Sequence, residues 1–294
     1  ITIAYVIALF VAGASLYWWD YGPLVDVFIA DLIATGVIFI FSRAYGNSSF
    51  YDAYWSVIPV FSALYWMAVG TTHAPPAREI LVLGLVLYWA SRLTLNWAYF
   101  WEGLQHEAWR YAMLRDKAPR WALLPDLFGI LLFPTLQVFA GLLPVYAVYC
   151  IGDRAFGWLD ILALVVTAGA ITLQMIADFQ LHRFIRHRRE GEQLETGLWA
   201  WSRHPNYFGE LGFWFGLFLF GLAAYPQGWY WLCVGSVLMT LMFVFASIPM
   251  MEQRSLERRP EYARVMNSVS MLVPRPRKRL PLMDSAVGTE LTGE

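Results

Sequence analysis

Residues 229–250, WYWLCVGSVLMTLMFVFASIPM, contain no charged side chain. A helix needs about 20 consecutive, mainly apolar residues to cross the hydrocarbon core of a bilayer, so this stretch predicts a transmembrane helix. The sequence Tyr225-Pro226-Gln227-Gly228 before it predicts a tight turn, and residues 207–225 on the other side of that turn form another apolar run. The C-terminal third of the chain therefore predicts two consecutive spans.

The rest of the chain repeats this pattern. The 294 residues are 59% hydrophobic and only 15% charged, whereas soluble domains have about 45–50% apolar and about 25% charged residues. We therefore predict an all-α fold, a polytopic membrane helix bundle with seven to eight transmembrane helices, in which Pro134 and Pro144 kink the fifth run. Cys150 and Cys233 are the only cysteines, which excludes a disulfide framework or a cysteine-built metal site. The further apolar runs are residues 1–17, which is short, 24–42, 52–70, 79–101, 127–150 and 158–178.

The placement of lysine and arginine predicts the orientation. Of these 21 residues, 18 lie in the segments after the second, fourth and sixth runs and in the C-terminal segment. Only Arg78 and Arg154 lie on the opposite side, and Arg92 lies inside a run. Because basic loops stay in the cytoplasm, we expect these segments and the C-terminus to be cytoplasmic. Residues 1–274 then form one membrane domain, and residues 275–294 form a basic, flexible tail.

Polar residues within the runs are candidates for a site because they are costly in a membrane. In the fourth run, Tyr88, Arg92, Asn96 and Tyr99 are spaced so that they share one helix face. They predict either a hydrogen-bonded seam against a neighbouring helix or the polar wall of a cavity, with the Tyr88 hydroxyl as a donor. Asp52, at the head of the third run, is either a helix cap or a site residue.

A charged cluster follows the sixth run. Gln174 and Asp178 are one helical turn apart, and four arginines come within seven residues just beyond them. These arginines fit anchoring at the cytoplasmic face, but guanidinium groups beside a carboxylate also bind phosphate well. The sequence leaves both interpretations open. The arginines are Arg183, Arg186, Arg188 and Arg189.

The most informative stretch lies at the head of the seventh run, where residues 203–210 have the sequence RHPNYFGE. Pro205 suits the first turn of a helix, where its missing amide costs nothing. Asn206 and Glu210 then lie on one face, and Glu210 lies within the span. No residue nearby in the sequence is an obvious partner for this carboxylate, which favours a role in binding.

These residues resemble the membrane-bound steroid 5α-reductase family, and more distantly sterol Δ14-reductases and isoprenylcysteine carboxyl methyltransferases. The resemblance is firm over residues 173–274 and implies a bacterial member in the inner membrane. It implies that Asn206 and Glu210 contact the nicotinamide end of NADPH, and that Tyr88 holds the 3-oxo group of a steroid. It also implies a substrate side at residues 1–101 and a cofactor side at residues 158–274. The implied cofactor residues are Asp178, Arg183 or Arg186, Arg203, His204, Asn206, Tyr207, Glu210, Glu252 and Arg254. The family's carboxylate partner of Tyr88 has no clear match, and Asp52, a candidate catalytic residue, or Ser56 falls near its position.

The chemistry that the resemblance implies is NADPH-dependent reduction of a conjugated enone. No dinucleotide-binding glycine motif and no Walker motif occurs, so a nucleotide has to bind in another way. The expected partners are a steroid or other lipid enone and membrane lipid, with no nucleic acid and no metal. Two alternatives are a membrane methyltransferase that uses S-adenosylmethionine, which would leave Asn206 and Glu210 without a role, and a non-catalytic sterol-binding protein.

Overall fold

The computed structural model describes residues 1–70, 76–116, 123–189 and 191–278, and within these ranges every regular element is a helix. The prediction of an all-α membrane bundle is thus confirmed. Six helical segments are long and apolar enough to cross a membrane. They are Pro23–Tyr45, Pro76–Tyr99, Pro125–Ile151, Trp158–His187, Pro205–Ala224 and Pro226–Arg258.

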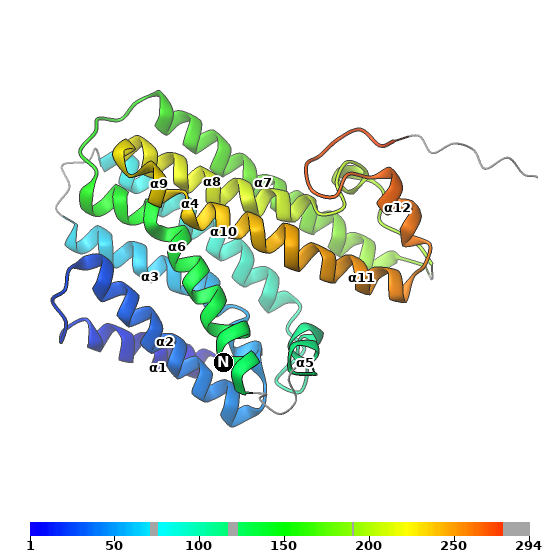
Figure 1. Cartoon of the computed structure of the whole chain (residues 1–294), viewed down its shortest axis with the longest axis horizontal. Coiled ribbons are helices and arrows are strands. Elements are labelled where there is room, and N and C mark those ends of the chain that lie inside the picture. Colours follow the sequence, from blue (N-terminus) through cyan, green and yellow to red (C-terminus); the bar gives the residue numbers. More distant parts are fainter. Residues whose placement is uncertain (71–75, 117–122, 190, 279–294) are drawn as a thin grey trace, which may run out of the picture.

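The helices form an elongated bundle whose connections gather at its two ends (Figure 1). Two predicted runs become shorter helices: α1 has 14 residues and α3 has 16, which correspond to about 21 and 24 Å against a hydrocarbon core of about 30 Å. The total of seven or eight crossings therefore stays a prediction. The principal helices are α1 (Thr2–Ser15), α2 (Pro23–Tyr45), α3 (Tyr54–Val69), α4 (Pro76–Tyr99), α5 (Trp109–Asp116), α6 (Phe133–Tyr146), α7 (Trp158–His187), α8 (Pro205–Ala224), α9 (Trp229–Leu232), α10 (Val234–Met242), α11 (Ile248–Arg258) and α12 (Tyr262–Ser268).

Widened helical turns accompany the two prolines of the fifth run. A π-helical segment, η3 (Pro125–Leu132), precedes α6, which has Pro134 in its first turn. A second one, η4 (Ala147–Ile151), follows Pro144. Proline removes a backbone donor and crowds the preceding turn, so a local change of pitch lets the helix continue through both positions.

The helices pack closely where small residues face one another. A Cβ atom on Gly235 of α10 would lie 2.3 Å from the backbone of Gly141 in α6, so these two helices touch backbone to backbone. Gly141 in turn lies against the ring of Trp214, which is fully buried. Close approach of this kind replaces the hydrophobic driving force that is absent between helices in lipid.

A buried ion pair joins α4 and α7 at one end of the bundle. Arg78 and Asp160 are both almost completely buried, and the guanidinium donates to the carboxylate at 2.6 and 2.9 Å. The carbonyls of Arg154 and Ala155 accept its remaining donors. One of the two basic residues predicted for the non-cytoplasmic side is therefore a helix-to-helix contact, and its guanidinium makes four hydrogen bonds within the protein.

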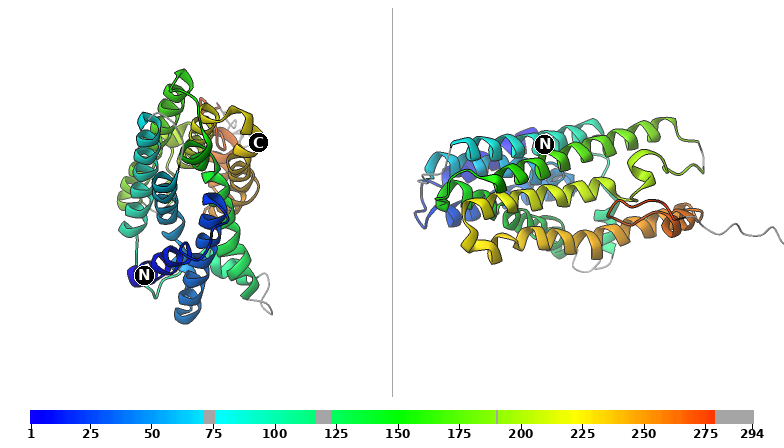
Figure 2. Two further views of the ribbon diagram at one scale, coloured as in Figure 1. Left: turned by 90° about the vertical axis from the view of Figure 1, so that its left-hand side faces the viewer. Right: turned by 90° about the horizontal axis from the view of Figure 1, so that it is seen from above.

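The opposite end of the bundle is closed by the C-terminal segment. Figure 2 shows the chain after α12 running back beside the start of α8, and the amide of Arg203 donates to the carbonyl of Ser270 at 2.8 Å. The amide of Arg275 likewise donates to the carbonyl of Trp201. The flexible end predicted for the tail lies, from residue 279 onwards, outside the described residues.

Candidate functional site

A buried charged cluster lies where α4, α7 and α8 meet. Arg92 of α4 donates to Asp178 and to the side-chain oxygen of Gln174, both on α7. Its guanidinium also lies 3.4 Å from the Glu210 carboxylate of α8. The side chains of Arg92, Asp178 and Glu210 are each about nine-tenths buried, and Gln174 is completely buried. One cation thus faces two carboxylates and an amide in the interior of the bundle.

Two indole groups hold the Glu210 carboxylate from the opposite side. The ring N–H groups of Trp89 and Trp214 each donate to Glu210 at 3.0 Å. Phe213 stacks on Trp89, with ring centres 4.5 Å apart and planes within 4° of each other. A carboxylate that accepts N–H bonds on both sides keeps a fixed orientation, because a rotation would break at least one of these bonds. Glu210 therefore has partners that its sequence neighbourhood does not suggest, apart from Trp214 one turn away.

The cluster leaves part of its hydrogen-bonding capacity unused. Among the described residues, four buried side-chain atoms lack a partner, and three of them belong to this region: Arg92 Nε, Gln174 Nε2 and Asn96 Oδ1. The first two are donors and the third is an acceptor. Buried polar atoms are rarely left unpaired, since each costs about 1–3 kcal/mol, and such a set marks a candidate place for a ligand or an ordered water.

Close packing of α7 against α8 builds this arrangement. A Cβ atom on Gly209 would lie 2.5 Å from Gln174 Cγ and 2.8 Å from the carbonyl of Ala170, so only glycine fits there. Two turns further along α8, a Cβ atom on Gly216 would likewise lie 2.0 Å from the hydroxyl oxygen of Thr167. These two glycines therefore allow α8 to approach α7 closely beside Gln174 and Thr167.

A cavity of about 510 Å³ opens beside the cluster at the end of the bundle that carries α5 and α11. Asn96, one turn beyond Arg92 on α4, lines it and so connects the cavity with the cluster. Its walls carry three arginines, of which Arg254 lies over the ring of Trp109 at 3.8 Å. The three carboxylates Asp52, Glu102 and Glu107 also line the cavity. Its other polar and aromatic side chains include Asn96, Trp97, Phe100, Trp101, His106, Trp109, Arg110, Arg254 and Arg258.

The structure brings Asn206 to the cluster with Asp178 and Glu210. The Asn206 side chain lies near Asp178, and its oxygen accepts a hydrogen bond from the amide of Tyr207 at 3.0 Å. Three residues predicted from two separate stretches of sequence are thus in one place, together with Arg92. Their role in binding stays a prediction.

The Arg203-His204 pair lies instead in a contact with the C-terminal segment. Arg203 donates to both oxygens of Glu252 at 2.6 and 3.2 Å and to two backbone carbonyls near the end of α12. His204 shares the Glu252 carboxylate at 3.1 Å and stacks on Tyr207. The Arg203 side chain thus makes four hydrogen bonds within the protein. These bonds fix the start of α8 to α11 and to the segment after α12.

Arg183 and Arg186 lie on the last turns of α7, beyond the cluster. Arg183 lines a second hollow of about 620 Å³ together with Gln180, His187 and Glu192. Arg186 lies over the ring of Tyr99 at 5.2 Å. Both arginines are therefore at the same end of the bundle as the first cavity, but neither lines it.

Tyr88 and Asp52 occupy different environments. Tyr88 is 39% exposed on the outer surface of the bundle, where its hydroxyl contacts the sulfur of Met175 on α7 at 2.7 Å. Asp52 lines the cavity and accepts hydrogen bonds from Arg110, at 3.0 Å, and from the hydroxyl of Tyr111. No contact joins the two predicted partners. The polar face of α4 nevertheless forms the hydrogen-bonded seam that is one of its two predictions, because Tyr88 and Arg92 both contact side chains of α7.

Sequence reasoning missed three residues of this region. Trp89 follows Tyr88 directly, and Trp214 stands four residues after Glu210, which is the spacing of neighbours on a helix face. That spacing was a usable signal for Trp214. Arg110 lies in a segment between spans, where no periodicity indicates which side chains turn towards the protein.

The fold and the site together define a class of protein, a helical membrane protein with a buried charged cluster beside an arginine-lined cavity. Residues 38–269 match the model of the DUF1295 family, described as a protein family of unknown function. The chain belongs to this family, which is related to steroid 5α-reductase-like membrane proteins. An uncharacterised protein of Schizosaccharomyces pombe is 26% identical over 284 residues, covering 88% of this chain and 82% of the yeast protein. No solved structure matches the chain.

Proposed function

We propose that this protein is a membrane-embedded reductase that uses NADPH to reduce the conjugated C=C bond of a lipid enone, with a 4-ene-3-oxo steroid as the favoured substrate class. The observation that carries the proposal is the set of unpaired buried atoms. Two donors, Arg92 Nε and Gln174 Nε2, and one acceptor, Asn96 Oδ1, complement a primary carboxamide. The nicotinamide ring of NADPH carries such a group.

The buried cluster would hold the nicotinamide end through side chains that are already oriented. Arg92 is fixed by Asp178 and Gln174, and Glu210 is fixed by two indoles, so little ordering is left for the moment of binding. When bound, NADPH supplies a hydride to the β-carbon of the enone. Asn206, beside Asp178, would help to fix which face of the ring meets the substrate.

Tyr88 would stabilise the charge that develops on the substrate. Its hydroxyl lies on the lipid-facing surface, one helical turn or about 6 Å along α4 from Arg92. A steroid that enters from the lipid between α4 and α7 would displace the contact with Met175 and receive the hydroxyl at its ketone oxygen. That hydrogen bond strengthens as the ketone becomes an enolate, and the α-carbon then takes a proton from solvent.

The phosphate groups would lie at the mouth of the cavity. Arg110, Arg254 and Arg258 line it, and its tryptophans offer flat faces to an adenine ring. With Arg183 and Arg186 nearby, this charge favours NADPH over NADH, because only NADPH carries the 2′-phosphate. We place the protein in the bacterial inner membrane with this end in the cytoplasm, where 18 of the 21 basic residues of the sequence are predicted to lie.

The test is ligand-induced thermal stabilisation of the purified full-length protein in lipid nanodiscs. NADPH is expected to raise the unfolding temperature more than NADH does, because binding to the folded state alone stabilises it. Stabilisation by S-adenosylhomocysteine in place of NADPH would overturn the proposal in favour of a methyltransferase. Stabilisation by a sterol, with no response to either nucleotide ligand, would identify a sterol-binding protein.

A further inference from the structure

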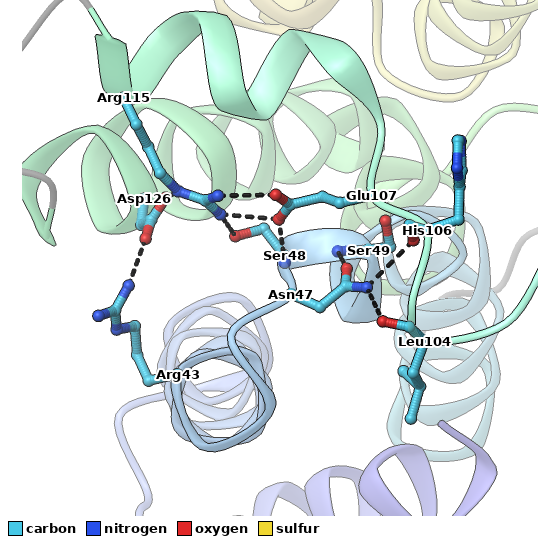
Figure 3. A network of polar contacts seen from close by, with 9 residues as sticks. All are labelled: Arg43, Asn47, Ser48, Ser49, Leu104, His106, Glu107, Arg115 and Asp126. Atoms are coloured by element: carbon cyan, nitrogen blue, oxygen red, sulfur yellow. Dashed lines mark hydrogen bonds and ion pairs between the residues drawn. The ribbon is translucent and has the colours of Figure 1, made fainter.

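A second polar network adjoins the cavity, and Glu107 belongs to both (Figure 3). Arg115 of α5 donates through two nitrogens to both oxygens of Glu107, each at 2.7 Å, and through Nε to Asp126 at 2.6 Å. Asp126, which is 1% exposed, also accepts Arg43 of α2 at 2.7 Å. We call Arg43, Glu107, Arg115 and Asp126 the brace.

The brace joins two segments of the chain that are distant in sequence. Glu107 accepts the amide of Ser48 at 2.7 Å, and Arg115 donates to the hydroxyl of the same serine at 2.8 Å. The amide of the Asn47 side chain donates to the carbonyls of Leu104 and His106, at 2.7 and 3.1 Å. Residues 104–107 are thus fastened to residues 47–48 mainly by hydrogen bonds.

The apolar anchoring of this region is limited to a few side chains. Tyr111 is the one buried residue of α5, with Ala108 and Leu114 partly buried against the same core cluster, and the Tyr111 hydroxyl is itself bonded to Asp52. Leu104 is exposed. Partial burial of Glu107 opposes its ionisation, but the bonds from Arg115 and the Ser48 amide outweigh burial and hold the pKa of this carboxyl below its usual range. Glu107 is therefore charged at neutral pH, and the brace is complete.

The segments fastened by the brace are the same ones that form one wall of the cavity. Asp52 lies on one segment, and Glu107, Trp109 and Arg110 lie on the other. α11 also lines the cavity, and its Arg254 lies over the Trp109 ring. The position of residues 104–110 therefore sets how far Arg110 stands from the arginines of α11.

We propose that the brace is a positioning device for the phosphate-bearing end of a dinucleotide: it holds Arg110 opposite Arg254 and so determines cofactor affinity rather than turnover. This inference rests on the proposed function. Arg115 suits the task because its planar guanidinium reaches two carboxylates and a hydroxyl at once, which a lysine ammonium on a flexible chain does not reproduce. None of the brace residues needs to touch the cofactor.

The experiment compares Arg115→Lys and Glu107→Gln with wild type in nanodiscs, measuring NADPH affinity by calorimetry and turnover at saturating NADPH with a 4-ene-3-oxo steroid. Both variants are expected to bind NADPH about 10-fold or more weakly, with turnover at saturation within about two-fold of wild type, because only the contacts at the phosphate end relax. Asp160→Asn is the matched control, since it breaks the buried Arg78 ion pair at the other end of the bundle. It is expected to lower thermal stability without changing NADPH affinity.

Several results would overturn the inference. Unchanged NADPH affinity in both brace variants refutes it while leaving the proposed function intact. An equal loss of affinity in Asp160→Asn at the same loss of thermal stability refutes it too, because the effect would then be general weakening of the fold. If wild type itself binds no NADPH, the proposed function and this inference fall together.

Discussion

Asn96→Leu is expected to weaken NADPH binding without weakening the fold. Asn96 Oδ1 is buried and has no hydrogen-bond partner, so in the ligand-free protein it contributes a cost of about 1–3 kcal/mol. Leucine has nearly the same shape as asparagine and carries no polar atom. The unfolding temperature of the ligand-free variant should therefore equal or exceed that of wild type, unlike the result for most polar substitutions inside a protein.

The effect on binding has the opposite sign. In the proposed complex the carboxamide N–H of the cofactor donates to Asn96, and leucine would leave that N–H buried without an acceptor. An unpaired buried donor costs about 1–3 kcal/mol, which corresponds to about 5- to 150-fold in affinity. In Asn96→Leu the unfolding temperature should thus stay the same or rise while the affinity for NADPH falls. A purely structural role of Asn96 does not predict this combination.

The assay measures both quantities on the same nanodisc preparation, with the unfolding temperature from tryptophan fluorescence and NADPH affinity from calorimetry. Thr172→Val is the control, because Thr172 is an exposed residue of α7 whose hydroxyl bonds only to the preceding turn. It should leave NADPH affinity unchanged. The reasoning is refuted if Asn96→Leu binds NADPH as tightly as wild type, or if it loses as much stability as affinity.

Further outcomes follow from the same geometry. Gly209→Ala would place a Cβ atom 2.5 Å from Gln174 Cγ, so we expect lower thermal stability and weaker NADPH binding, whereas Gly84→Ala, with no atom within 4 Å of its Cβ, should change neither. Tyr88→Phe should reduce turnover of a 4-ene-3-oxo steroid by about 100- to 1000-fold and leave NADPH affinity unchanged; near-normal turnover would return Tyr88 to a packing role. Because the pKa of Glu107 is lowered, ionised Glu107 stabilises the folded protein at pH values above the ordinary carboxyl pKa. This stabilisation is lost as the pH falls through the lowered pKa. The difference in unfolding temperature between wild type and Glu107→Gln should therefore shrink on acidification, and a constant difference would contradict this assignment.

The positions of the apolar helices could be predicted from the sequence because hydropathy decides them, whereas the short helices α5 and α12 lie outside the predicted runs. Every apolar run became a helix, and the prolines at 134 and 144 lie beside widened turns as their missing donors require. The number of crossings could not be fixed, since α1 and α3 are too short for length alone to decide.

The site could be predicted only where its residues share a helix face or a recognisable motif. Arg92 and Asn96 share one face of α4, and Asn206 and Glu210 share one face of α8. Of these four residues, Arg92 and Asn206 lie beside Asp178, a meeting that the sequence did not predict. Which atoms stay unpaired depends on how α4, α7 and α8 pack, and no pattern within a single helix contains that information.

Arg203 illustrates the opposite case. Its motif predicts a cofactor contact, but its guanidinium is engaged by Glu252 and by carbonyls of Met266 and Val269. Backbone carbonyls leave no trace in a sequence, because every residue has one. A contact that depends on where a distant segment runs can therefore be found only in the three-dimensional structure.

Transfer of deuterium from NADPH to a steroid tests the central claim most directly. The purified protein in nanodiscs would be incubated with a 4-ene-3-oxo steroid and NADPH deuterated at the transferred position of the nicotinamide ring, and the product analysed by mass spectrometry and NMR. Our account predicts a saturated ketone with one deuterium at the former β-carbon, and loss of this product in Tyr88→Phe. Unchanged steroid after complete incubation, with NADPH bound by the protein, would contradict the assignment of the substrate, and a saturated product without deuterium would contradict hydride transfer from this cofactor.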